Sequence, residues 1–228
     1  MFTTVSSAGP RSLPRGPHQL AREVVVASQR GRMIDAMAQA VAEKGYAATT
    51  VADVVARAGV SRRTFYEHFA DREDCFLAAY DTGVVIMLDH LLAQATAPDV
   101  ESWRERVRRG LRAYLEILAT EPAFARTFLI EVLAAGPRAL ARRAEVHERF
   151  VDLLREQAQL ARQEHPELPE VPDPVYTAIV GGVDEVVSTW IREGRGDRLP
   201  ELEPALTYLQ VALLAGPSVA AAEVPQAS

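Results

Sequence analysis

The chain has 228 residues, of which 48% are hydrophobic and 25% charged, and its formal net charge is −6. This is the composition of a globular protein long enough for one or two domains around a sizeable core. No run of eighteen apolar residues occurs, and residues 1–20 lack the apolar stretch of a secretory signal, so we expect no membrane span and no export. The lone Cys75 excludes an internal disulfide and favours the reducing cytoplasm. Its apolar surroundings predict a buried side chain rather than a reactive thiol.

The charge is unevenly distributed along the chain. Residues 1–66 carry nine Lys or Arg against four Asp or Glu, a balance of +5, so the remainder carries −11. A basic head on an acidic body is the distribution that attraction to nucleic-acid phosphates predicts, although basic segments are often only solvated. Residues 1–17 are rich in Pro, Gly, Ser and Thr and include Arg11 and Arg15, so we expect a flexible basic arm.

Beyond the arm the sequence shows no strand alternation. Apolar residues recur at helical spacing between Gly and Pro breaks, which predicts an all-α fold of about nine or ten helices. Gly45 stands where a left-handed C-terminal cap belongs, and residues 216–228 are expected to form a disordered tail. The expected helices span 18–27, 29–44, 51–58, 62–69, a segment that begins after Asp71, 99–119, 122–133, 138–163, 174–193 and 203–214.

The helices over 51–58 and 62–69 are short and joined by a tight connection, which predicts a helix-turn-helix. Thr50 is the expected cap of the first helix, with Asp53 in place of the usual Glu of a capping box. Gly59 supplies the positive φ that the turn requires, and Ser61 caps the second helix.

The second of these helices has two distinct faces. Helical periodicity places Phe65 and Phe69 on an inner face and Arg63 and Glu67 directly opposite, with Arg62, Thr64 and Tyr66 beside them. Arg can donate two hydrogen bonds to guanine, and the hydroxyls suit phosphate oxygens. A solvated face that carries Arg and Glu for solubility would have the same pattern.

The run 29–81 resembles the DNA-binding domain of the TetR family of bacterial transcriptional regulators. The resemblance rests on Glu43-Lys44-Gly45-Tyr46, Thr49-Thr50-Val51, Ala58-Gly59-Val60-Ser61, Thr64-Phe65-Tyr66 and His68-Phe69. The stretch 131–137 is similar, more weakly, to many actinobacterial members. The resemblance implies an N-terminal three-helix DNA-binding domain over 18–72 and a C-terminal helical domain for effector binding and dimerisation over 73–215.

The same resemblance implies which side chains contact double-stranded DNA. Thr50, Thr64 and Tyr66 fall where members touch phosphates, Arg62 and Arg63 where base edges are read, and His68 at the end of that surface. Arg72 stands where members commonly carry a phosphate-binding Lys, whereas Ala52 removes a base contact that some members make. Arg15 in the arm is a further candidate: it would enter the minor groove, or the arm is an idle tail.

The later helices offer candidates for an effector pocket. Trp103, Phe124 and Phe128 lie among Leu, Val and Ala, although an aromatic residue at helical spacing is more often core. Glu131 stands in an otherwise apolar run. It would anchor a cationic or hydroxylated effector, or pair with an arginine between Arg104 and Arg112.

Family resemblance further implies that the helices over 174–193 and 203–214 join two subunits in a four-helix bundle, so that a homodimer binds a palindromic operator. Small residues at Ala178, Gly181 and Gly182 would allow close helix approach. The expected function is therefore a cytoplasmic repressor released by a small, largely apolar effector. An activator, or a regulator that senses a protein partner, is the alternative.

The sequence gives little support to an enzyme. It has no glycine-rich phosphate loop and no nucleophile or zinc motif, and its five histidines have no ligand spacing. We therefore expect no catalytic residues, no metal and no cofactor.

Overall fold

The computed structural model describes residues 28–216 and residue 219. Within this part all regular structure is helical, with nine α-helices and two 3₁₀ helices, which confirms the all-α prediction. The predicted arm, the predicted helix over 18–27 and nearly all of the predicted tail lie outside it. The elements are α2 (Gln29–Lys44), α3 (Val51–Ala58), α4 (Arg62–His68), α5 (Arg72–Ala95), α6 (Trp103–Thr120), α7 (Pro122–Leu129), η1 (Glu131–Ala134), α8 (Pro137–Glu164), α9 (Asp173–Arg192), η2 (Gly196–Leu202) and α10 (Glu203–Ala215).

The helix ends agree with the sequence best where a local cap fixes them. Helices α2 and α3 have the predicted bounds. The helix expected over 99–119 instead begins at Trp103, because the hydroxyl of Ser102 accepts a hydrogen bond from Glu105 N (3.2 Å). The left-handed cap predicted at Gly45 is wrong: φ is +80° but ψ is 159°, so the chain leaves α2 in an extended direction. The helix expected over 122–133 ends at Leu129 and continues as η1.

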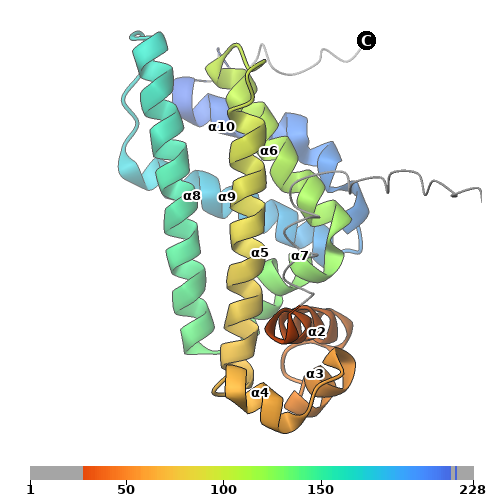
Figure 1. Cartoon of the computed structure of the whole chain (residues 1–228). Coiled ribbons are helices and arrows are strands. Elements are labelled where there is room, and N and C mark those ends of the chain that lie inside the picture. The colour runs from red at the N-terminus through yellow and green to blue at the C-terminus, as the bar shows by residue number, and fades with distance from the viewer. Residues whose placement is uncertain (1–27, 217–218, 220–228) are drawn as a thin grey trace, which may run out of the picture.

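The nine helices form one elongated body, with α2, α3 and α4 at one end and the later helices above them (Figure 1). Helix α5 leads from α4 through the centre of the molecule, between α8 and α6. A continuous hydrophobic cluster extends from Met33 in α2 through Phe76 and Tyr80 in α5 to Leu214 in α10. The two predicted domains therefore share a core, and the expected boundary between residues 72 and 73 falls in the first turn of α5.

By length and composition alone, helix α5 is long and apolar enough to cross a membrane. We expected no membrane span, because the sequence has no run of eighteen apolar residues. It carries Asp81 and Asp89 within that length. Its buried residues include Phe76, Tyr80 and Met87, which pack in the common core. We therefore assign α5 as a core helix, a class that passes the same test.

Candidate nucleic-acid interface and effector cavity

Helices α3 and α4 form the predicted helix-turn-helix. Thr50 and Asp53 make the capping box at the start of α3, in which each side chain bonds the other residue's backbone N–H. Gly59 follows α3 in the left-handed conformation (φ 65°, ψ 40°), which L-residues with a Cβ adopt at a cost. Ser61 then caps α4 by accepting a hydrogen bond from Thr64 N (3.0 Å). Two helix caps and the left-handed conformation of Gly59 thus fix the angle at which α4 leaves α3.

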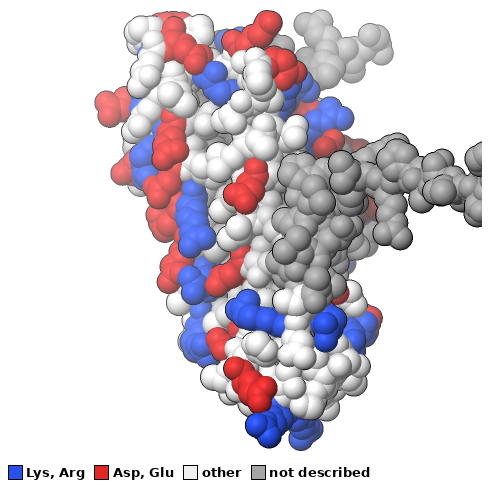
Figure 2. Space-filling view, in the orientation of Figure 1, with Lys and Arg blue, Asp and Glu red and all other residues white. Residues whose placement is uncertain are grey.

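Helix α4 has the two faces that its sequence predicts. Phe65 and Phe69 are buried, and their rings lie 5.4 Å apart between centroids. On the opposite side the Arg63 side chain is 90% exposed, and Tyr66 is 58% exposed. Arg62 and His68 are also exposed. Figure 2 shows basic side chains gathered at the tip of the molecule where α3 and α4 lie. An anionic surface can therefore approach α4 without meeting the rest of the body.

Several of these side chains already have partners within the segment formed by α2, α3 and α4, which we call the head. Arg63 pairs with Glu67 one turn later (3.0 Å), and Thr64 Oγ1 lies 2.9 Å from Ser61 Oγ. Thr50 Oγ1 donates to Asp53 (2.6 Å). The Arg63–Glu67 pair is solvent-exposed and therefore weak, so a base edge or phosphate can replace Glu67 at little cost.

Lys44 adds a cation to this surface that the sequence did not single out. Its ammonium lies 2.6 Å from Asp53, beside the start of α3. Hydrogen bonds from Lys44 and Thr50 hold the pKa of the Asp53 carboxyl well below its usual range. The capping carboxylate therefore stays charged, and Lys44 partly offsets its repulsion of an incoming phosphate.

Arg72 has a second role beside the one that the resemblance implies. Its Nη1 donates to the backbone carbonyls of Tyr46 (3.1 Å), Ala47 (3.4 Å) and Thr49, and its guanidinium lies 4.2 Å from the centre of the Tyr46 ring. The first residue of α5 thereby holds the turn between α2 and α3. Arg15, the arm candidate, lies outside the described residues.

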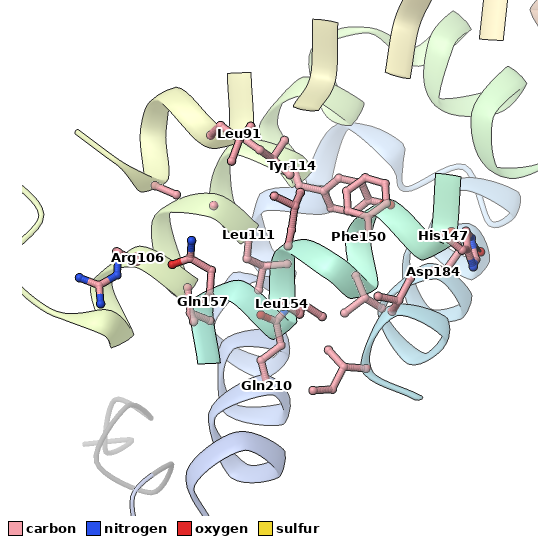
Figure 3. Close-up of a pocket in the computed structure, with 18 of the residues that line it drawn as sticks. Leu91, Arg106, Leu111, Tyr114, His147, Phe150, Leu154, Gln157, Asp184 and Gln210 are labelled. Carbon is pink, nitrogen blue, oxygen red and sulfur yellow. Dashed lines mark ion pairs between the residues drawn. The ribbon is translucent and has the colours of Figure 1, made fainter. Parts of the chain in front are cut away.

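The body contains a cavity of about 130 Å³, bounded mainly by α5, α6, α8 and α9. By the same measure a single water needs about 10–15 Å³, so the cavity has room for a small molecule. Its wall is largely apolar, with Leu111, Tyr114, Phe150 and Leu154 along the middle (Figure 3). Arg106 and Gln157 stand at one end, and His147 and Asp184 at the other. This is the composition of a ligand site: apolar, with a few placed polar groups.

The polar end at α8 and α9 is charge-balanced. Arg143 forms an ion pair with the buried Asp184, and His147 Nε2 lies 3.6 Å from the same carboxylate. Burial and the nearby Arg143 charge lower the pKa of His147, which therefore stays neutral at physiological pH. The sequence singled out neither Asp184 nor His147. The available signal was the acidic pair Asp184 and Glu185 between Val183 and Val186 on a mainly apolar helix.

Of the four aromatic and acidic residues predicted for an effector pocket, the structure places one in this cavity. Phe128 lines it. Phe124 stacks on Phe128 (5.4 Å between centroids) and fills the space beside Gly83. Trp103 lies in a second hydrophobic cluster with Val107, and lines a smaller cavity of about 10 Å³.

The fourth residue, Glu131, joins the body to the head. Its buried carboxylate accepts a hydrogen bond from Tyr46 N (2.8 Å), in the turn that Arg72 also holds. Its ion-pair partner is Arg126 of α7 (3.0 Å), not an arginine between Arg104 and Arg112. Glu131 is therefore a contact between η1 and the α2–α3 turn and does not line the cavity.

Helices α9 and α10 expose an apolar surface made by Val186, Tyr208 and Leu213. Ala178 is exposed as well, and within the described part of the chain no atom lies within 4 Å of a Cβ placed on Gly181. Gly182 differs, because Leu209 of the same subunit packs 3.7 Å from its Cβ position. Two of the three small residues thus face outward, available to another helix.

Comparison with known proteins agrees with this geometry. The family model described as bacterial regulatory proteins, tetR family, matches residues 33–79. The fatty acid degradation regulator FadR from Bacillus halodurans has the same fold, with a TM-score of 0.73 at 21% identity over 87% of this chain and 97% of that one. FadR from Bacillus subtilis, solved in complex with stearoyl-CoA, gives 0.70 at 18% identity over 81% and 97%. A TetR-like regulator from Rhodococcus sp. RHA1 gives 0.59 at 19% identity over 88% and 99%. No curated protein sequence matches significantly.

Proposed function

Since this chain belongs to the TetR family of DNA-binding transcriptional regulators, we propose that it is a cytoplasmic repressor that leaves a palindromic operator when a small effector enters its cavity. Family and fold are those of regulators rather than enzymes, and no group of three potential metal-ligating side chains occurs among residues 28–216. The observation that carries the DNA-binding part is helix α4, anchored by Phe65 and Phe69, with Arg62 and Arg63 directed outward.

In this proposal Arg62 and Arg63 read base edges in the major groove. Thr50, Thr64 and Tyr66 contact phosphates, His68 lies at the edge of the contact, and Arg72 and Arg15 add positive charge. The exposed apolar surface of α9 and α10 joins two subunits, which places two copies of α4 in successive major grooves of one palindrome.

The cavity supports a small-molecule effector over a protein partner, because a sensor of proteins needs no internal space. A fold neighbour solved with stearoyl-CoA supports the same choice. Helix α7 connects the cavity with the DNA-binding helices. Phe128 of α7 lines the cavity, and Glu131, two residues after the end of α7, bonds the turn before α3. A ligand that displaces Phe128 would thus move the α2–α3 turn and change the orientation of α3 and α4.

The direct test is to retain genomic fragments on the purified protein at two salt concentrations and to sequence them. Recovery of one palindromic motif with steep salt dependence supports a specific dimeric regulator. Retention without sequence preference would refute base reading by α4. Titration of the recovered operator with candidate effectors then separates release, the expected outcome, from tightening, which would make the ligand a co-repressor.

A further inference from the structure

Two buried polar atoms at one end of the cavity have no hydrogen-bond partner in the described part of the chain. They are Oε1 of Gln157 on α8 and Nε of Arg106 on α6, and both residues line the cavity. The two helices are adjacent here, because Arg106 bonds Glu164 of α8 (2.6 Å) and the small cavity beside Trp103 is lined by both Val107 and Gln157. In Figure 3 the two side chains lie at the same end. Buried polar groups without partners are rare in native proteins, and inside a cavity a bound water, ion or ligand can supply the missing bond.

The charges around this end are already balanced. Arg106 forms an ion pair with Glu164, and Asp184 at the far end forms one with Arg143. An anionic ligand would have to compete with Glu164 for Arg106, and a cationic one with Arg143 for Asp184. The unpartnered buried atoms at this end are then one acceptor, Gln157 Oε1, and one donor, the Nε–H of Arg106.

We propose that the effector is an uncharged amphipathic molecule whose apolar body lies along Leu111, Phe150 and Leu154 and whose polar end is a hydroxyl or a primary amide. Such a group donates to Gln157 Oε1 and accepts from Arg106 Nε, so it satisfies both atoms at once. A carboxylate offers no donor, and an ether or thioester offers no donor either. The proposal rests on the regulator function above and specifies the chemistry of its ligand.

The test compares four probes of one chain length by isothermal titration calorimetry: 1-octanol, octanamide, octanoate and heptyl methyl ether. We expect the alcohol and the amide to bind about ten-fold more tightly than the ether or the carboxylate, the effect of one hydrogen bond made in place of an unsatisfied group. Equal binding of alcohol and ether, or tighter binding of octanoate, overturns the proposal while leaving ligand binding intact.

Two variants locate the effect. Gln157→Leu removes the acceptor at similar volume, so the preference for octanol over the ether should fall to two-fold or less while the ether still binds. Arg106→Lys keeps the charge beside Glu164 but removes the Nε donor, and it should weaken octanamide in the same way. Gln159→Leu is the matched control, because Gln159 is exposed on the same helix. Loss of selectivity in the control, or its survival in Gln157→Leu, refutes the assignment.

Operator binding separates this proposal from the function on which it depends. If octanol binds selectively but leaves operator affinity unchanged, the ligand chemistry stands and effector release fails. If stearoyl-CoA releases the operator, and does so equally from wild type and Gln157→Leu, effector release stands and the uncharged class is wrong. If no probe binds and none alters operator affinity, both proposals fail.

Discussion

The contact between Glu131 and the α2–α3 turn can be tested by removing the carboxylate. In Glu131→Ala the backbone N–H of Tyr46 loses its 2.8 Å acceptor in a buried position. An unsatisfied buried donor costs about 1–3 kcal/mol. Arg126 also loses its partner, but its side chain is about half exposed, which limits that loss to less than about 1 kcal/mol. We therefore expect the free energy of unfolding to fall by about 1–4 kcal/mol.

Glu131→Gln gives a graded result, because the amide oxygen can still accept from Tyr46 N while the charge is lost. A charged hydrogen bond becomes a neutral one, so the expected loss is about 1 kcal/mol. The matched control is Glu116→Ala, which breaks an exposed i,i+4 pair with Arg112 (2.9 Å) and should cost less than about 0.5 kcal/mol. Urea unfolding followed by circular dichroism measures all three.

Hydrogen exchange reports the same contact locally. The Tyr46 amide should be protected in wild type and in Glu131→Gln and should exchange faster in Glu131→Ala. If this carboxylate also transmits the effector signal, Glu131→Gln will reduce the change in operator affinity that a bound effector causes. An alanine variant as stable as the Glu116→Ala control, with unchanged exchange at Tyr46, would refute the structural reasoning outright.

Four further outcomes are expected. Arg63→Ala should relax base preference at one position per half-site in a binding-site selection; uniform weakening across sequences would instead indicate a phosphate contact. Gly181→Leu should abolish dimerisation in analytical ultracentrifugation while the monomer keeps its helical circular dichroism spectrum, because the open space at Gly181 accepts the side chain; a stable dimer would remove this surface from the interface. The lowered pKa of His147 means that the unfolded chain takes up its proton first, so stability should decline as pH falls through and below about 6.5, and His147→Gln should flatten that part of the pH profile in urea melts. Arg72→Lys keeps the charge but not the fork that reaches several carbonyls, so stability should drop by about 1–2 kcal/mol in the same melts, whereas a pure phosphate contact would leave it unchanged.

The helix-turn-helix could be predicted almost residue by residue because its determinants are local. Thr50 and Ser61 cap helices through bonds to residues three positions away, and Gly59 acts through its own φ. The outward direction of Arg63 follows from helical periodicity once Phe65 is known to be buried. Each of these facts depends on a span of a few residues, which a sequence displays directly.

The cavity and the contact between Glu131 and the α2–α3 turn could not be predicted in this way. The residues that form them are distant from one another in the chain. Glu131 bonds Tyr46, 85 positions earlier, and Arg143 pairs with Asp184, 41 positions later. Periodicity shows that Trp103 and Phe128 face inward, but a residue that lines a cavity and one that fills a core have the same spacing. The expected helix over 122–133 also hid the break at Leu129, which is what brings Glu131 to the head.

The two contacts on the α2–α3 turn hold the two backbone groups of one residue, Tyr46. Glu131 accepts the N–H of Tyr46, whereas Arg72 bonds the carbonyl of Tyr46 and stacks on its ring. One contact comes from the segment after α7 and the other from the first residue of α5, so the turn keeps both only while these two elements hold their relative position. An effector that moves α7 against α5 must therefore weaken one contact or drag the turn with it. Either response changes the orientation of α3 relative to α4, and this is how, in the proposed function, a ligand in the cavity would act on a helix that the cavity does not touch.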